Sequence, residues 1–178
     1  MIKISITGPE SSGKSVLCEW LADRMLNAIA IPEVARVYLE AREPGYNYTK
    51  EDLIKITEQS KTNLENVVKT NPEVVINDSD FYIMRIWWEE VYKTENQFIN
   101  ALSKDLYFDV YVLCEPDLPW VYDPLRENEH DRYRLYEIYK NALHGDNRKV
   151  IVANGLDEKR FVKVIEELKE LFPHLQTK

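Results

Sequence analysis

The segment Gly8–Ser15 reads GPESSGKS and fits G-x-x-x-x-G-K-[ST], the pattern of a phosphate-binding loop, or P-loop. In such a loop, backbone N–H groups converge on a phosphate, and the positive end of the following helix strengthens the attraction. Lys14 can bridge the β- and γ-phosphates, and the Ser15 hydroxyl can ligate Mg²⁺. The segment therefore predicts binding of a nucleoside triphosphate, expected to be ATP, together with Mg²⁺. The residues expected to contact it are Gly8, Glu10, Ser11, Ser12, Gly13, Lys14, Ser15 and Val16.

Asp78 ends the apolar run Val74–Asp78, which has the composition of a buried strand. A carboxylate there can hold Mg²⁺ through water or accept the proton of an attacking hydroxyl. Asp80 follows two residues later and could take the other role or bind a hydroxyl of the substrate. Ser79 and Asp80 are also suited to cap the next helix. We expect Asp78 to be the general base or the metal-binding carboxylate, and Asp80 to contact substrate.

A segment rich in proline and aromatic residues follows the fourth apolar run. Residues 118–126 read LPWVYDPLR, and Arg132 and Arg134 come soon after. Arginines on a mobile segment can stabilise the charge on a transferred phosphoryl group and help to exclude water. Each could instead pair with neighbouring acidic residues on a solvated helix, but Arg126 is favoured because it follows a proline-rich turn. We expect a helical lid region at about residues 116–135.

Five short apolar runs alternate with longer polar segments of helical periodicity. The runs are 2–7, 28–31, 74–78, 110–114 and 149–153, and the clearest helical segments are 16–22, 50–69, 129–143 and 157–171, the last with Asp157 as its N-cap. Continuous apolar strands that alternate with helices are typical of a parallel sheet covered on both faces. The sequence therefore predicts an α/β fold of the P-loop NTPase kind, with a doubly wound, five-stranded parallel sheet flanked by helices.

Sheets of this kind bind ligands at the carboxyl ends of their strands. Those ends carry the P-loop, Glu33, Asp78, Glu115 and Asn154, so we expect the site there. Residues 154–156, including Asn154 and Leu156, are expected to lie against adenine.

Composition narrows the substrate class. The formal net charge is −8, whereas a protein that binds nucleic acid usually has a basic face, so a small substrate is expected. No apolar run approaches the ~20 residues that cross a bilayer, and the chain enters its first strand without room for a signal peptide. We therefore expect a cytoplasmic protein that binds neither nucleic acid nor membrane. Cys18 and Cys114 lack metal-site spacing and are expected to be buried thiols.

Three classes of P-loop protein have to be distinguished. A GTPase needs D-x-x-G after its acidic strand and N-K-x-D for guanine, whereas this chain has DSDF at 78–81 and NGLD at 154–157. A motor ATPase usually carries bulky apolar residues before a paired Asp-Glu and often needs a longer chain. A kinase needs an acceptor site and a lid, and the chain offers candidates for both. The residues therefore favour a kinase.

Four motifs together resemble one kinase family. They are GPESSGKS at 8–15, PEVARVYLE at 32–40, NDSDF at 77–81 and DLPWVYDPLREN at 117–128. Over roughly residues 1–172, they resemble in order and content the ribosylnicotinamide kinase domain of NadR-type NAD-salvage proteins. The resemblance implies ATP- and Mg²⁺-dependent phosphorylation of the 5′-hydroxyl of nicotinamide riboside, which gives nicotinamide mononucleotide. We expect residues 1–178 to form a single P-loop kinase domain with a small nucleoside substrate.

The resemblance also implies roles for individual residues. The positions that match the family are Glu33, Arg36, Asp78, Asp80, Trp120, Asp123 and Arg126. Glu33 and Arg36 could contact the ribose or the attacking hydroxyl, and Trp120 and Asp123 are expected at the substrate. Val34 replaces an aromatic residue and Pro124 replaces a glycine, which leaves the base specificity open. Aromatic residues would suit a cationic ring, and the candidates, each of which could instead be an ordinary core residue, are Tyr38, Tyr46, Tyr48, Trp87 and Trp88.

Two alternatives remain open. Residues 42–45 read REPG, as in thymidylate kinases, although they follow a helix and not the end of the second strand. Another nucleoside or nucleotide kinase is therefore the first alternative. The second is a P-loop ATPase that is regulated by a partner protein and has no small acceptor.

Overall fold

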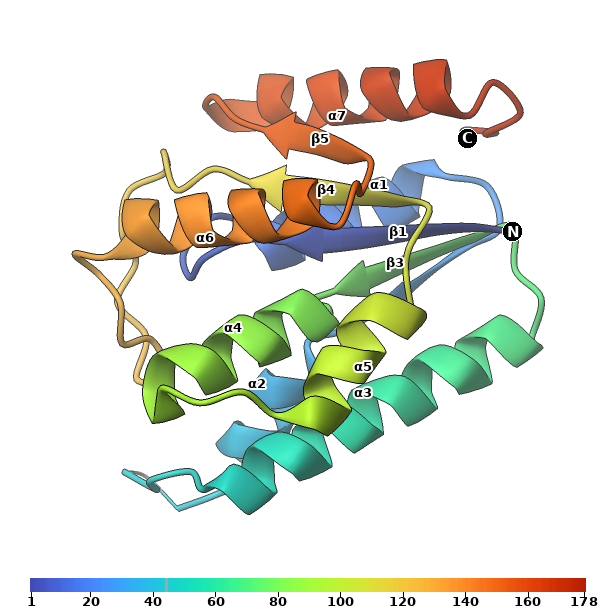
Figure 1. The fold of residues 1–178 in the computed structure, drawn as a ribbon. Helices are drawn as coiled ribbons and strands as arrows, with labels where there is room; N and C mark the ends of the chain where they lie inside the picture. Colours follow the sequence, from blue (N-terminus) through green and yellow to red (C-terminus); the bar gives the residue numbers. More distant parts are fainter. Residues whose placement is uncertain (44) are drawn as a thin grey trace.

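A computed structural model describes residues 1–43 and 45–178. Pro44, part of the REPG segment, lies outside the described residues. The described part of the chain contains five strands, all paired in parallel, in the order β2-β3-β1-β4-β5 (Figure 1). The strands are β1 (Ile2–Thr7), β2 (Ala28–Ile31), β3 (Val74–Asp78), β4 (Val110–Cys114) and β5 (Val150–Ala153). The predicted five-stranded parallel sheet is confirmed, and four of the five strands have the predicted bounds.

Helices cover both faces of the sheet. They are α1 (Lys14–Arg24), α2 (Val34–Glu40), α3 (Lys50–Lys69), α4 (Phe81–Tyr92), α5 (Gln97–Asp105), α6 (Arg132–Gly145) and α7 (Asp157–Leu171). Because successive strand residues point to opposite faces, Ile4 and Ile6 of β1 pack with α1 and α7. Val75 of β3 and Leu113 of β4 pack with α4 and α6. Figure 1 shows α1 behind the sheet and α6 in front of it.

Some helix boundaries differ from those predicted. The segment 115–131 contains no helix or strand, so the lid region becomes helical only at Arg132. The prediction that Asp157 caps α7 is wrong. Leu156 is the N-cap residue and Asp157 already lies in the helix with a φ of 61°, one position too late for its carboxylate to cap the first turn. In the described part of the chain, no helix is both long enough and apolar enough to cross a membrane.

The sheet order brings the predicted site residues to one edge. β1 lies between β3 and β4, and Ile6 at its end pairs with Asp78 of β3. Asp78 therefore ends the strand that lies beside β1. Both cysteines are buried, as expected. The P-loop leaves β1 between the carboxyl ends of its two neighbours.

Candidate active site

The P-loop connects β1 to α1 and depends on its two glycines. Gly8 has a φ of 129°, and a Cβ atom there would lie 2.7 Å from the carbonyl oxygen of Cys114. Gly13, the N-cap of α1, has a φ of 80°, and a Cβ atom there would lie 2.9 Å from Cδ1 of Leu118. Both positions therefore favour glycine by backbone conformation and by space. The loop ends at the start of α1, where the backbone N–H groups and the helix dipole attract an anion.

Side chains within the P-loop hold its shape. The Ser12 hydroxyl donates to the carbonyl oxygen of Pro9 at 2.7 Å, and Nζ of Lys14 donates to the same oxygen at 2.9 Å. Ser15 lies exposed in the first turn of α1. The Lys14 ammonium and the Ser15 hydroxyl thus belong to adjacent residues at the end of an anion-binding loop.

A cavity of about 840 Å³ opens beside the P-loop. The P-loop, the start of α2, the segment before α3, α4 and the lid region all contribute to its wall, and its volume is typical of ligand sites. The predicted residues on this wall are Gly8, Glu10, Ser11, Ser12, Gly13, Lys14, Ser15, Val16, Glu33, Arg36, Asp123 and Arg126. The fold therefore gathers most of the predicted site residues around one space.

Two predicted carboxylates, Glu33 and Asp78, differ in their position relative to this cavity. Glu33 immediately precedes α2 and lines the cavity, whereas Asp78 at the end of β3 is not part of its wall. Burial raises the pKa of Glu33, the ammonium of Lys14 opposes that shift, and the charge of Asp78 adds to it. Asp78 is 4% exposed and accepts a long hydrogen bond of 3.5 Å from the Ser79 hydroxyl. Of these two carboxyl groups, Glu33 is thus the one that borders the cavity.

Ser15 and Asp78 fit a magnesium ion. Both offer oxygen ligands, which Mg²⁺ prefers. Within residues 1–43 and 45–178, the long bond from Ser79 is the one hydrogen bond that the Asp78 carboxylate accepts. Among the described residues, no three His, Cys, Asp or Glu side chains cluster as a metal site. Mg²⁺ in phosphoryl-transfer sites is usually held by one or two protein groups together with substrate phosphates and water. These residues match that arrangement.

Asp80 belongs to the fold and not to the cavity. Its Oδ1 accepts hydrogen bonds from the backbone N–H groups of Tyr82 and Ile83 at 2.9 and 3.1 Å, and its Oδ2 accepts one from the Ser5 hydroxyl at 2.6 Å. The residue is 3% exposed, and burial raises its pKa. The expectation that Asp80 contacts substrate is therefore corrected, because its oxygens are used inside the protein. The alternative, that Asp80 caps the next helix, is confirmed for α4.

An ion pair connects α2 to the lid region at the cavity. Nη2 of Arg36 donates to Asp123 at 2.8 Å, and its Nη1 donates to Glu40 at 2.9 Å. Asp123 also accepts the backbone N–H of Leu125 at 2.9 Å. Burial opposes the charged form, but the hydrogen bonds from Leu125 and Arg36 lower the pKa of Asp123 overall. Arg36 and Asp123, both predicted at the substrate, are thus brought together and bind each other.

Two arginines of the lid region lie against the P-loop. Nη1 of Arg126 donates to the carbonyl oxygen of Val121 at 2.6 Å and approaches the Ser11 hydroxyl at 3.5 Å. Nη1 of Arg132 donates to the carbonyl oxygen of Ser11 at 3.3 Å. The two guanidinium groups lie 6.0 and 5.6 Å from the ring centroid of Trp120, which is outside the cavity wall. Arg132 therefore joins Arg126 as a positive charge next to the loop.

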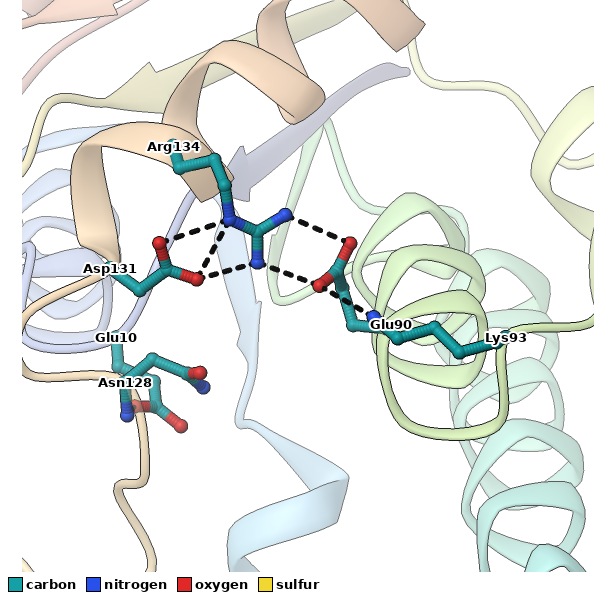
Figure 2. Close-up of polar contacts among 6 residues, drawn as sticks. All are labelled: Glu10, Glu90, Lys93, Asn128, Asp131 and Arg134. Carbon is teal, nitrogen blue, oxygen red and sulfur yellow. Dashed lines mark hydrogen bonds and ion pairs between the residues drawn. The ribbon is translucent and has the colours of Figure 1, made fainter.

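Arg134 is held in an ion-pair network instead (Figure 2). Its guanidinium donates to Asp131 at 2.5 to 3.0 Å and to Glu90 of α4 at 2.7 and 3.1 Å. Lys93 also binds Glu90, at 3.4 Å. The hydrogen bonds that Arg134 donates to Glu90 and Asp131 raise its pKa above its usual value. The network therefore fixes the start of α6 against α4, as the alternative of pairing with acidic neighbours predicts for this arginine.

The side chain of Glu10 extends from the P-loop to the lid region. Its Oε2 accepts hydrogen bonds from the backbone N–H groups of Glu127 and Asn128 at 3.0 and 2.9 Å. Figure 2 shows Glu10 beside Asn128. The P-loop pattern predicts a contact with ATP at this position and contains no sign of this contact with the lid region.

Two of the aromatic residues that line the cavity pack against each other. The rings of Tyr48 and Trp87 lie edge to face with 4.8 Å between centroids, and Nε1 of Trp87 donates to the Tyr48 hydroxyl at 2.9 Å. That hydroxyl donates in turn to Glu127 at 3.3 Å. Trp88 instead packs in a buried cluster between α3, α4 and α5. Of the aromatic candidates, Tyr48 and Trp87 are therefore placed to meet a ring, and Trp88 is a core residue.

Asp52 is a buried carboxylate that the sequence reading did not single out. It is 3% exposed and accepts hydrogen bonds from the hydroxyls of Tyr38 and Tyr46 at 2.6 and 2.8 Å. It also forms a capping box with Thr49 at the start of α3. The bond from Tyr38, helped by those from Thr49 and Tyr46, lowers the pKa of Asp52 despite burial. Since Tyr46 lines the cavity, Asp52 positions part of its wall, and the Thr-x-x-Asp spacing was the available signal.

Arg160 is a second residue that was not predicted. Its side chain is 1% exposed and pairs with Asp117. It also donates to the carbonyl oxygens of Ser12, Glu115 and Gly155 at 2.9, 3.0 and 3.3 Å. One buried guanidinium therefore ties the P-loop to the segments that follow β4 and β5.

The residues expected at adenine lie apart from the cavity wall. Oδ1 of Asn154 accepts a hydrogen bond from Lys163 at 2.9 Å, and Leu156 is 58% exposed. A separate hollow of about 470 Å³ lies between α1 and α7, and its wall includes Asp157 and Phe161. Asn154 and Leu156 are therefore not brought to the space that the P-loop borders.

Comparisons with known proteins agree with this geometry. A sequence model of a family described as AAA domain matches residues 3–160. The trifunctional NAD biosynthesis/regulator protein NadR of Escherichia coli strain K12 is 28% identical over 173 residues, which are 94% of this chain and 42% of that protein. The chain thus spans less than half the length of this relative.

Two solved structures share the fold. A NadR protein in complex with NR superposes with a TM-score of 0.81 at 20% identity, over 99% of this chain and 51% of that one. A thymidylate kinase from Ehrlichia chaffeensis superposes with a TM-score of 0.65 at 15% identity, over 94% of this chain and 98% of that one. The chain therefore shares its fold with these two proteins.

Proposed function

This chain belongs to the AAA domain family, and from this premise we propose that it is an ATP-dependent kinase that phosphorylates the 5′-hydroxyl of nicotinamide riboside. One observation carries the proposal: a single cavity wall combines a phosphate-binding loop, a carboxyl group with a raised pKa and an arginine. Phosphoryl transfer to a hydroxyl needs these three elements together. The similarity to NadR, and to a NadR structure that contains NR, supports nicotinamide riboside as the acceptor.

We also propose that residues 1–178 act as one kinase domain, with a lid region at about 116–135, in the cytoplasm. The P-loop amides and Lys14 bind the phosphates of ATP. Ser15 and Asp78 hold Mg²⁺, which when bound neutralises charge on the phosphate oxygens. Arg126 stabilises the charge that develops on the transferred group. The lid region over the cavity excludes water, which would otherwise compete with the acceptor.

Glu33 is the better candidate for the base that accepts the proton of the 5′-hydroxyl. It lines the cavity, whereas Asp78 does not. Its pKa is raised, and a base works best when its pKa lies near the working pH. Asp78, buried at the end of β3, is then left to hold the metal. This division gives each of the two carboxylates one task.

The part of the cavity wall that contains Tyr48, Trp87, Glu90 and Glu127, here called the acceptor wall, suits a cationic nucleobase. Tyr48 and Trp87 offer aromatic rings, which attract a positive charge through their faces. The carboxylate of Glu127 belongs to the same wall and is not paired with a cation among the described residues, whereas that of Glu90 is paired with Arg134 and Lys93. A pyridinium ring would therefore meet both aromatic and negative groups there, which favours nicotinamide riboside over neutral nucleosides.

An ADP-release assay tests the proposal. The protein would be incubated with ATP and Mg²⁺ and with one acceptor at a time: nicotinamide riboside, neutral nucleosides and dTMP. We expect strong stimulation by nicotinamide riboside alone. Stimulation by another member of the panel would keep the kinase mechanism and replace the substrate. ATP binding without stimulation by any acceptor would overturn the proposal in favour of an ATPase regulated by a partner protein.

A further inference from the structure

Glu10 occupies the third position of the P-loop, yet its carboxylate contacts the protein instead of pointing into free space. One oxygen, Oε2, accepts two backbone hydrogen bonds, from Glu127 at 3.0 Å and from Asn128 at 2.9 Å. These two residues directly follow Arg126 in the chain. Hydrogen bonds to an ionised carboxylate are about twice as strong as neutral ones. The Glu10 carboxylate therefore binds the backbone strongly at the two residues that follow Arg126.

The next P-loop residue, Ser11, binds the same segment at Val121. The Ser11 hydroxyl accepts the backbone N–H of Val121 at 3.0 Å. The carbonyl oxygen of Val121 accepts the guanidinium of Arg126 at 2.6 Å. Consecutive P-loop side chains thus hold the segment 121–128 at both ends, and Arg126 lies between the two attachments.

We propose that Glu10 is a positioning residue for Arg126: the P-loop itself fastens the lid region, so that the arginine lies over the phosphates that the same loop binds. This inference deepens the proposed function and rests on it for the role of Arg126. Since a misplacement of about 1 Å can reduce turnover ~10²-fold, a fastening of this kind affects the rate of transfer more than the affinity for ATP.

The remainder of the lid region is held without Glu10. Arg134 binds Asp131 and Glu90, which fixes the start of α6 against α4 (Figure 2). Arg36 of α2 binds Asp123 of the same segment. Loss of the Glu10 carboxylate should therefore free residues 126–128 locally and leave α6 in place.

Hydrogen exchange on the full-length protein tests the contact directly. In Glu10→Ala, the backbone amides of Glu127 and Asn128 should exchange at least ~10-fold faster than in the wild type, because they lose their acceptor. The matched control is Glu129→Ala, which removes an exposed acid of the same segment whose side chain makes no hydrogen bond or ion pair among the described residues. Equal exchange in Glu10→Ala and Glu129→Ala would overturn the proposal.

Kinetic measurements then show whether Glu10 positions Arg126 or only stabilises the folded protein. In Glu10→Ala we expect kcat to fall by about tenfold or more, with KM for ATP within ~3-fold of the wild type. Glu10→Gln keeps one oxygen that can accept both amides and should recover most of the rate. The double variant Glu10→Ala/Arg126→Ala should be no slower than Arg126→Ala alone. Additive losses, or no recovery in Glu10→Gln, would contradict the positioning role.

The two experiments keep the inference apart from the proposed function. Exchange is measured without nucleotide or acceptor, so it remains readable if nicotinamide riboside proves not to be the substrate. Absence of acceptor-dependent turnover in the wild type would overturn the proposed function. Unprotected amides at 127 and 128 in an active wild type would overturn only the role of Glu10.

Discussion

Glu33 and Asp78 show how burial and position divide two carboxyl groups between different tasks. Of the two, only Glu33 borders the cavity, and its pKa is raised, by burial first and by the charge of Asp78 second. A raised pKa makes a carboxylate a stronger base once it has lost its proton. The rate of phosphoryl transfer should therefore depend on the protonation state of Glu33.

The first prediction concerns the pH profile of kcat/KM. A general base has to be deprotonated, so activity should be lost as the pH falls through the raised pKa of Glu33, above the pH where an ordinary glutamate titrates. Glu33→Gln should reduce turnover by ~10²-fold or more and abolish this acid limb. Asp78→Asn should also slow the reaction but keep the limb. A limb that survives in Glu33→Gln and disappears in Asp78→Asn would reverse the two assignments.

Helix α3 and the cavity wall are connected through one side chain. Asp52 caps the first turn of α3 and accepts the hydroxyls of Tyr38 and Tyr46, the second of which lines the cavity. Capping boxes usually matter only for helix stability. Here the same carboxylate also orders a loop at the substrate space, so element stability and site geometry are linked.

The second prediction is that Asp52→Asn lowers the free energy of unfolding by about 1–3 kcal/mol, the usual cost of breaking buried charged hydrogen bonds. Because the folded-state pKa of Asp52 is lowered, its stabilisation is complete above the pKa of the unfolded chain and is lost as the pH falls through the folded value. The difference in Tm between wild type and Asp52→Asn should thus be largest near pH 7 and shrink below about pH 4.

The matched control for that comparison is Glu51→Gln. Glu51 lies in the same first turn of α3 but is exposed, so its neutralisation should change Tm little at any pH. A pH-independent difference between wild type and Asp52→Asn would contradict the proposed role of the ionised carboxylate.

At the scale of elements, strands are more predictable from this sequence than the connections between them. Strands β2, β4 and β5 are short, continuous apolar runs because parallel sheets are buried on both faces. Strand β1 instead alternates apolar with polar residues, and helices α3 and α7 follow from their periodicity. The lid region offers no such periodicity. Its conformation depends on distant partners, such as Glu10 for Asn128 and Arg36 for Asp123. Local patterns cannot specify such contacts.

In the candidate site, too, residues in a local motif are predictable and residues that depend on distant partners are not. The P-loop residues are predictable because their roles lie in a contiguous motif with a physical reason for each position. Asp80 was misassigned because an acidic residue after a strand suits a helix cap and a substrate contact equally well. Arg160 was not predicted because its four partners come from three separate segments. Only the folded chain brings those carbonyl groups together.

At the scale of the whole molecule, one buried cation joins three segments at the carboxyl edge of the sheet. Arg160 links the P-loop to the connections after β4 and β5. Binding of a nucleotide to the P-loop should therefore stabilise the sheet edge as a whole, and not only the loop.

The third prediction follows from this arrangement. At a Mg²⁺·ATP concentration of about 100 times Kd, the native state should gain about 2.7 kcal/mol, which for a chain of this size raises Tm by roughly 5–11 °C. Lys14→Ala should lose most of this shift. Lys55→Ala, which removes an exposed lysine from α3, should keep it. An unchanged shift in Lys14→Ala would show that ATP binds outside the P-loop.

The placement of the four tryptophans makes the protein its own optical reporter. Trp87 lies on the cavity wall, Trp120 lies beside Arg126 and Arg132, and Trp20 and Trp88 pack elsewhere, against Phe161 and within the α3–α4–α5 cluster. Emission from a variant that keeps only Trp87 would follow occupancy of the acceptor wall. Emission from one that keeps only Trp120 would follow the lid region. The order in which the two substrates arrive could thus be timed without attaching a dye.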